Sequence, residues 1–472
     1  MTDTEARAAI GLRSERGPIL AAIMVATSLI ALDSTIIATA VLTITDQLGG
    51  FAQFPWLFSI YLLAQAVTVP IYGKLADTFG RKPIMIFGIA VFALGSLLCG
   101  LAGSMLTLIV ARAVQGIGAG AVGPMSITIA GDIYTVAERA RVQAYLAAVW
   151  ASSSVLGPLL GGVFSEYVSW RWIFLINLPL SALAAWMILR YFTESTPRQR
   201  HRIDYLGAGL LTAGAGALML ALLEGGHAWA WNSPASLGLF GGGALTLVIF
   251  GFVERRAANP ILPLWVLTRR VLVASSLISL LVGAILLGLT SYVPTFAQGV
   301  LGTSALTAGL TVGALTLGWP LSASQAGKIY LRTGFRWTAL LGSTIVVAGS
   351  AVLLLVNAES ALLHVALGCF VVGMGMGLVA SPTLIAAQAS VEWSERGVVT
   401  SSNMFARSLG SALGVALFGA LVNSRVGGTD HPEAAQLAPA VHLVFIGVAV
   451  AAVVMVAASA AMPRRDAVVH AP

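Results

Sequence analysis

The sequence carries little charge. Only 10% of its 472 residues are Asp, Glu, Lys or Arg, whereas a water-soluble domain has about 25%. Hydrophobic residues make up 58% of the chain, and the mean hydropathy is +0.90. These values exclude an ordinary soluble surface and indicate an integral membrane protein. The formal net charge of +7 is spread over many short segments and forms no basic face, so we expect no nucleic-acid partner.

Cysteine is nearly absent, and histidine is not clustered. Cys99 and Cys369 both lie in apolar segments, so neither a disulfide framework nor a thiolate metal site is expected. None of the six histidines has a second one three or four residues away that could share a metal ion. We therefore expect no metal and no cofactor. No small-residue cleavage site follows the first apolar run, so we expect that run to remain as a membrane span.

Long apolar runs dominate what is present. The hydrocarbon core of a bilayer, about 30 Å thick, needs about 20 apolar residues per helix. Polar residues separate fourteen runs of this length, which predicts fourteen membrane-spanning helices at residues 18–43, 54–72, 83–102, 105–130, 142–163, 171–191, 205–223, 235–253, 271–293, 305–326, 338–356, 361–386, 398–421 and 441–462.

The basic residues orient these helices, because Lys and Arg in short loops stay on the cytoplasmic side of a membrane. With both termini in the cytoplasm, all but four of the 26 basic residues fall in cytoplasmic segments; the exceptions are Arg112, Arg171, Arg407 and Arg425. An odd number of helices would destroy this separation. Three Lys against 23 Arg is typical of a GC-rich bacterial genome. The sequence thus predicts a multi-pass protein of the bacterial inner membrane with both termini cytoplasmic.

The chain also contains an internal repeat. Compared with itself at a shift of 254 to 257 residues, it matches at several glycines and charged residues. The matches pair Gly73, Lys74 and Gly80 with Gly327, Lys328 and Gly334, and Gly116, Gly118 and Gly120 with Gly373, Gly375 and Gly377. Six predicted helices precede residue 192 and six follow residue 269. We therefore predict an N-terminal six-helix bundle (1–192), two linker helices (193–268) and a C-terminal six-helix bundle with a short cytoplasmic tail (269–472).

Four short segments resemble motifs of one family. Residues 73–82 are similar to the loop between the second and third helices of the major facilitator superfamily, and residues 112–118 are similar to its fourth-helix motif. Residues 157–162 resemble the fifth-helix motif of its antiporters, and residues 32–37 the first-helix motif of the fourteen-helix drug:proton antiporters. The chain departs from these patterns at Ala38, Leu42 and Ser153, which bears on the packing of the first and fifth helices.

The resemblance covers nearly the whole chain and implies an all-α membrane fold, with two six-helix bundles around a midplane cavity and two additional central helices. It also implies a proton-coupled antiporter of the multidrug exporter type, which exports hydrophobic drugs or related lipophilic compounds from the cytoplasm by alternating access. The implied partners are a small lipophilic substrate, neutral or monocationic, together with protons as the coupling ion and membrane lipid. We expect the protein to function as a monomer.

Other functions remain as alternatives. One is an exporter dedicated to a single metabolite, antibiotic or lipid, and another is a transport-inactive membrane sensor. An enzyme is disfavoured, because no paired carboxylates, no nucleophile with a base and no metal cluster lie at a common depth in the predicted helices.

Asp33 is the acid that the sequence places deep within a predicted span. A carboxylate there is costly unless it is neutralised, paired or reached by water, so we predict that Asp33 is the proton-coupling site; the alternative is a residue that only hydrogen-bonds neighbouring helices. Arg112 resembles the fourth-helix arginine of the family, which is implied to influence protonation of that acid, or else it only pins two helices together through carbonyl groups. Arg407 has no equivalent in the first half, where the repeat places Ser154, and we interpret it as structural.

Two further motifs predict moving or packed parts. The resemblance implies that Gly73, Asp77, Gly80 and Arg81 form a latch that holds the outward-facing state together at the cytoplasmic side, with the two glycines allowing close backbone approach; the alternative is that the basic residues only set topology. In the second half Leu331 and Phe335 replace the two charged residues. The fifth-helix motif consists of Gly157, Pro158, Gly161 and Gly162. It predicts a bend at the interface of the two bundles; the alternative is ordinary small-residue packing.

The glycine triplet at 116, 118 and 120 lies inside a predicted helix with no preceding strand, so we expect it to serve helix packing and not nucleotide binding. A central cavity would be lined by sparse polar groups among aromatic residues and methionines. The candidates are Gln65, Met125, Trp150, Asn177, Tyr292, Gln298, Trp319, Met374 and Asn403, each with core or interfacial packing as its alternative.

Overall fold

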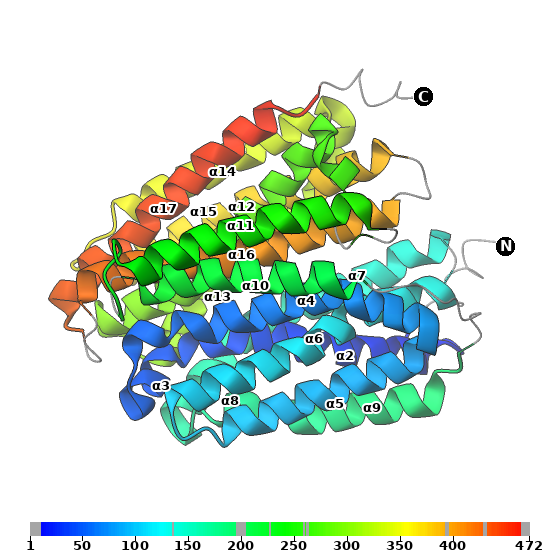
Figure 1. Ribbon diagram of the computed structural model, residues 1–472, viewed down its shortest axis with the longest axis horizontal. Coiled ribbons are helices and arrows are strands. Elements are labelled where there is room, and N and C mark those ends of the chain that lie inside the picture. The colour runs from blue at the N-terminus through cyan, green and yellow to red at the C-terminus, as the bar shows by residue number, and fades with distance from the viewer. Residues whose placement is uncertain are drawn as a thin grey trace.

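The computed structural model describes residues 11–134, 136–194, 204–225, 228–257, 260, 264–391, 396–427 and 432–463. Fourteen of its helices are long and apolar enough to cross a membrane. In the described part of the chain, the β structure is limited to one isolated bridge between Gly225 and Trp229. The predicted all-α fold and the predicted number of spans are therefore confirmed, and Figure 1 shows the long helices running side by side.

The first predicted span is not one continuous helix. It consists of α2 (Gly17–Ile36), the 3-10 turn η1 (Ile37–Thr39) and the short helix α3 (Val41–Leu48). The turn tightens because the Ala40 amide donates to the Ile37 carbonyl and the Thr39 hydroxyl donates to the Ile36 carbonyl, at 3.0 and 3.2 Å. A 3-10 turn inside a long helix often marks a functional hinge or a strained segment.

The rest of the N-terminal half contains five more spans. After the turn η2 (Phe51–Gln53) come α4 (Pro55–Phe79), α5 (Arg81–Gly100), α6 (Met105–Ile133) and α7 (Val136–Val163), and α7 continues into a π-helical turn, η3 (Phe164–Val168). The sixth predicted span is divided at Ile176 into α8 (Trp172–Leu175) and α9 (Asn177–Tyr191). This division makes Asn177 the first residue of α9.

Two helices separate the halves, and six form the C-terminal half. The linker helices are α10 (Tyr205–Glu224) and α11 (Pro234–Arg256). The turn η4 (Leu264–Leu267) leads into α12 (Arg270–Gly299), α13 (Ala305–Thr333), α14 (Phe335–Leu354), α15 (Leu362–Ala389), α16 (Arg396–Val426) and α17 (Ala434–Ala460). In Figure 1, α10 lies between α4 of one half and α16 of the other, and it packs against both, while α11 packs on α10.

Local sequence sets several helix boundaries. Ser104 and Thr107 form a capping box at the start of α6, and Asp204, Ser233 and Ser304 cap α10, α11 and α13. Gly80 and Gly334 end α4 and α13 with φ angles of 106° and 89°. Side chains rarely adopt these angles, so the repeat keeps glycine at both positions.

The internal repeat is a repeat of packing contacts. Gly116 and Gly120 of α6 lie against α4, and Gly118 lies against α5; Gly373 and Gly377 of α15 lie against α13, and Gly375 lies against α14. A Cβ atom at any of these positions would overlap an atom of the neighbouring helix. Small residues permit such close approach in membranes, which confirms the predicted packing function of the glycine triplet.

The two halves meet at one end of the bundle. We call the end at which α2 begins and α17 ends the basic end, since several described helices begin or end there beside Lys or Arg residues such as Arg16, Arg81 and Lys82. The other is called the opposite end. The halves pack through α7 on α13 and through α4 on α16. The contacts across these two pairs, and those from the turns η1 and η2 to α12 and α16, gather toward the opposite end: Gly162 with Leu306, Pro158 with Gly309, Pro55 with Gly419, Ala52 with Asn423 and Thr39 with Gln298.

Candidate functional site

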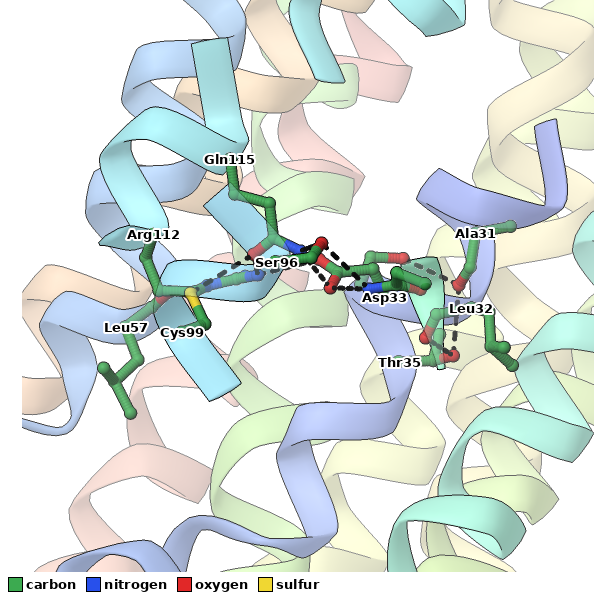
Figure 2. A network of polar contacts seen from close by, with 11 residues as sticks. Ala31, Leu32, Asp33, Thr35, Leu57, Ser96, Cys99, Arg112 and Gln115 are labelled. Atoms are coloured by element: carbon green, nitrogen blue, oxygen red, sulfur yellow. Dashed lines mark hydrogen bonds and ion pairs between the residues drawn. The ribbon is translucent and has the colours of Figure 1, made fainter. Parts of the chain in front are cut away.

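Asp33 forms a buried ion pair with Arg112. Asp33 lies in the last turn of α2 and Arg112 in the second turn of α6, and each is only 1% exposed. The distance from Arg112 Nη1 to Asp33 Oδ2 is 2.7 Å. Figure 2 shows the two side chains reaching toward each other between their helices. The predicted acid and the predicted cation are therefore direct partners.

Both oxygens of the Asp33 carboxylate accept hydrogen bonds. Gln115 Nε2 donates to Oδ1 at 2.7 Å, and Asn177 Nδ2 donates to the same oxygen at 3.0 Å. The side-chain oxygen of Gln115 accepts from Arg112 Nη1 at 2.6 Å, and its Nε2 also donates to the Ser96 hydroxyl at 2.8 Å. These bonds to both carboxylate oxygens compensate much of the cost of burying the charge. Among the described residues, the side-chain oxygen of Asn177 has no hydrogen-bond partner.

The Arg112 guanidinium has further partners besides Asp33 and Gln115, including the Phe174 ring, whose centre lies 5.9 Å from its Cζ. Its Nε donates to the Leu57 carbonyl of α4 at 2.9 Å, and its Cζ lies 4.1 Å from the centre of the Tyr61 ring. The cation is thus held on one side by a carboxylate and on the other by a carbonyl and an aromatic face. Because the carbonyl and the ring do not depend on Asp33, they can retain Arg112 when the carboxylate becomes neutral.

Five helices of the N-terminal half supply this cluster. Arg112 and Gln115 are three residues apart on α6 and therefore lie on one face, and Ser96 and Cys99 have the same spacing on α5. Asn177 reaches Asp33 because α9 begins there, after the division of the sixth span. The Cys99 thiol lies 3.8 Å from Gln115 Oε1.

The loop motif at the basic end forms a second charged cluster. Arg81 Nε lies 2.9 Å from Asp132 Oδ2 at the end of α6, and the Arg81 amide donates to the Glu194 carboxylate. Lys82 Nζ donates to the carbonyls of Leu189 and Phe192 at 2.9 and 2.6 Å. These bonds join the start of α5 to the ends of α6 and α9.

Part of the latch prediction needs correction. Gly73 does not permit a close approach, because a Cβ atom there would have no neighbour within 4 Å. Gly80 does, since a Cβ atom there would overlap the Glu194 carboxylate. The side chain of Asp77 lies outside the described residues. The sequence prediction missed Asp132 and Glu194, whose only sequence signal was their position at helix ends beside the motif.

The fifth-helix motif faces two different neighbours. Gly157 and Gly161 lie against Thr35 and Ile36 in the region where α2 passes into η1. Pro158 and Gly162 lie against Gly309 and Leu306 of α13, in the other half. Two of the four residues therefore sit at the predicted interface of the bundles, and two position α7 on the helix that carries Asp33.

Comparison with known proteins identifies the family. The profile of the Major Facilitator Superfamily matches residues 23–415. The chain belongs to this superfamily. It is 36% identical over 389 residues to multidrug resistance protein 3 of Bacillus subtilis (strain 168), which covers 82% of this chain and 76% of that protein. It is 34% identical over 417 residues to the multidrug transporter protein MdtP of the same organism, covering 88% and 77%.

Solved structures agree on the fold of this major facilitator. An inward-facing, unoccupied bacterial homologue of the human lysosomal transporter Spinster superposes with a TM-score of 0.68 at 16% identity, covering 95% of this chain and 97% of that one. The nucleoside transporter NupG superposes with a TM-score of 0.65 at 13% identity, covering 94% and 99%. At these identities the comparison establishes the architecture alone. The chain is a membrane transporter by family, which is the basis for excluding an enzyme.

The predicted cavity residues of this transporter lie in several different environments. Asn177 belongs to the Asp33 cluster, and Asn403 bonds to Ser275 and Ser279, which packs α16 on α12. Met125 is buried in the core of the N-terminal half. Tyr292 and Gln298 lie where the halves meet: the Tyr292 ring packs on the Phe54 ring, with their centres 5.2 Å apart, and Gln298 donates to the Thr39 carbonyl. Trp150 is 44% exposed, and the others are partly buried: Gln65, Trp319 and Met374.

Sequence reasoning missed four members of the Asp33 cluster: Tyr61, Ser96, Cys99 and Gln115. Gln115 could have been found, because it lies three residues after Arg112 within the recognised fourth-helix motif and so shares its face. Glu254 was also missed; it is 2% exposed near the end of α11, at the basic end, and is not part of this cluster.

Proposed function

We propose that this transporter exports hydrophobic, drug-like compounds across the bacterial inner membrane in exchange for protons. The observation that carries the proposal is the buried Asp33, a carboxylate inside a membrane span with a cation as its partner. Ionisable groups inside a membrane mark ion pathways and proton relays. The substrate class is supported by the relatives, two of which are named for multidrug resistance or multidrug transport.

The basic end is proposed to face the cytoplasm, in line with the positive-inside rule. Both termini are then cytoplasmic, and the end at which the halves meet is the extracellular one. The described arrangement is accordingly assigned to an inward-facing state, closed toward the outside by α7 on α13 and α4 on α16. One chain supplies both halves, so the monomer is the proposed functional unit.

We propose that the proton and the substrate are coupled because they favour opposite states of one conformational equilibrium of the transporter. Protonation of Asp33 removes the negative partner of Arg112 and leaves that cation on the Gln115 side-chain oxygen, the Leu57 carbonyl and the Tyr61 ring. The ion pair joins α2 to α6, and hydrogen bonds of the same cluster connect α5 and α9 to them. Protonation therefore weakens interactions that hold these four helices in their present arrangement. A substrate that binds better to the state with charged Asp33 then opposes the proton, which is the condition for exchange.

The test is Asp33→Asn in proteoliposomes, with ethidium as the transported probe and an imposed pH gradient. We expect uphill accumulation to be lost while ethidium binding to the purified protein changes less than about threefold, because the amide keeps the volume and cannot carry the proton. Glu359→Gln is the matched control, since Glu359 is an exposed acid between α14 and α15. Full proton-driven uptake by Asp33→Asn would sink the proposal.

A further inference from the structure

Arg407 is the second arginine inside a membrane span, and its backbone is held tightly. It lies on α16, where Gly283 of α12 packs so closely that a Cβ atom at position 283 would overlap the Arg407 carbonyl oxygen. One turn earlier, Asn403 bonds to the hydroxyls of Ser275 and Ser279 on α12 at 2.9 and 2.7 Å. The position from which the Arg407 side chain projects is therefore set by packing.

The guanidinium of Arg407 lies over an aromatic ring. Its Cζ is 5.4 Å from the centre of the Trp319 ring on α13, and both side chains are partly buried. The Trp319 backbone is also held, because a Cβ atom at Gly377 of α15 would overlap its carbonyl oxygen. The helices that carry the pair, α16 and α13, are those that pack on α4 and α7 of the other half. Arg407 and Trp319 thus lie on two helices of the C-terminal half that pack on the N-terminal half.

In the described part of the chain, the positive charge of Arg407 has no carboxylate partner. All six acids of residues 269–472 lie outside the bounds of α12 to α17: Glu359, Glu392, Glu395, Asp430, Glu433 and Asp466. In the described residues, the Arg407 side chain makes no hydrogen bond or ion pair, and its interaction is the cation–π contact with the Trp319 ring. Arg112, by contrast, has a carboxylate, an amide, a carbonyl and two rings. An aromatic face compensates only part of the cost of a cation at this depth.

We propose that Arg407 and Trp319 form a recognition site for lipophilic organic anions. A carboxylate or sulfonate can pair with two N–H groups of the planar guanidinium, and an aromatic group attached to it can pack on the indole ring. The inference rests on the proposed export function and extends its substrate class from neutral and monocationic compounds to aromatic anions. This proposal gives Arg407 a binding function in place of the structural one expected from the sequence.

A pair of fluorescent probes tests this site on the purified protein in detergent. 8-Anilino-1-naphthalenesulfonate is an aromatic anion, and N-phenyl-1-naphthylamine has the same ring system without the sulfonate; protein-free micelles give the background. We expect Arg407→Gln to weaken binding of the anion by about tenfold or more and binding of the amine by less than about twofold. Trp319→Ala should weaken both. Arg425→Gln is the matched control, because Arg425 is an exposed arginine on the same helix, and it should change neither.

Equal weakening of both probes by Arg407→Gln, or unchanged binding of the anion, would overturn the site. If Arg407→Gln does not fold, Arg407→Lys tests the same point, because it keeps the charge and loses the planar fork. A loss of about threefold for the anion alone supports the site, and an unchanged affinity rejects it. Binding is measured without a membrane or a gradient. A wild-type protein that binds the anion through Arg407 but shows no proton-driven export would reject the proposed function and leave this site standing.

Discussion

Asp33 and Arg112 each lower the cost of the other's charge inside the membrane. A buried charge left without its partner is destabilising by about 3–5 kcal/mol, whereas replacing both members of a pair by apolar residues is often neutral. The pair is 1% exposed at both residues, so solvent cannot take the place of a missing partner. The two residues should therefore behave as a unit in stability and not as independent contributors.

The prediction at this scale is a mutational cycle. Arg112→Met should lower the stability of the detergent-solubilised protein by about 3–5 kcal/mol, because it leaves the Asp33 carboxylate with amide donors alone. The double variant Asp33→Leu with Arg112→Met should regain most of that loss while remaining inactive in proton-coupled transport. Thermal and denaturant unfolding of the four proteins measures the coupling. Additive losses in the double variant would contradict the assignment of a mutually dependent pair.

Helix boundaries and helix contacts distinguish glycines that look alike in the sequence. Gly73 and Gly80 belong to one motif, but only Gly80 has a positive φ, 106°, and a neighbour that a side chain would meet. Gly80→Ala should therefore destabilise the protein by about 1–2 kcal/mol through backbone strain. Gly73→Ala, the matched control in the interior of α4, should leave stability unchanged or slightly raised. The midpoint of thermal unfolding decides the point, and equal midpoints for the two variants would refute it.

The contact between α7 and α13 supplies a second pair of glycines. Gly309 faces the Pro158 carbonyl closely enough that a Cβ atom would overlap it, while Gly313, one turn further along α13, has no neighbour within 4 Å of a Cβ atom. Gly309→Val should hold the halves apart at the opposite end and shift the population away from the described state. Gly313→Val is the control. Distances between spin labels at the ends of α7 and α13 report the population, and Gly309→Val should also slow transport by about tenfold or more. An unchanged distance distribution in Gly309→Val would show that this contact does not set the closed state.

The whole molecule combines two halves of similar packing but different polarity. Gly157 and Gly161 position α7 on α2, and Gly410 and Gly414 position α16 on α12 in the same way. The polar cluster exists in one half only, because the repeat equivalent of Asp33 is Leu287 and that of Gln115 is Val372. Asp33 is therefore the carboxyl group that we propose to carry a proton at depth.

One proton per transport cycle is the expected stoichiometry. A charge crossing about 100 mV gains about 2.3 kcal/mol, and each pH unit adds about 1.4 kcal/mol. A monocation that leaves as one proton enters moves no net charge, so it should respond to the pH gradient alone, whereas a neutral substrate should respond to both terms. A potential imposed on proteoliposomes without a pH gradient tests this. Strong accumulation of a monocation under that condition would require a second proton.

The sequence by itself determined the properties that depend on composition along one helix. The length of each apolar run must match the bilayer, so the number of spans and the all-α class followed from the chain alone. Asp33 and Arg112 could also be recognised from the sequence, because a charged residue inside an apolar run is costly in a membrane. The repeated glycines predicted helix packing because close approach needs small residues wherever the partner helix lies.

Tertiary structure alone decided which side chains meet. The rotation of each helix about its axis, and its depth relative to its neighbours, bring Ser96, Gln115 and Asn177 to one carboxylate, and neither quantity is encoded in a single segment. Because the sequence does not give the relative depth of two helices, Asp132 was not recognised as the partner of Arg81. The end at which the halves close is equally a property of contacts between distant segments, such as Pro158 with Gly309, because one sequence supports both states and only the packing selects one.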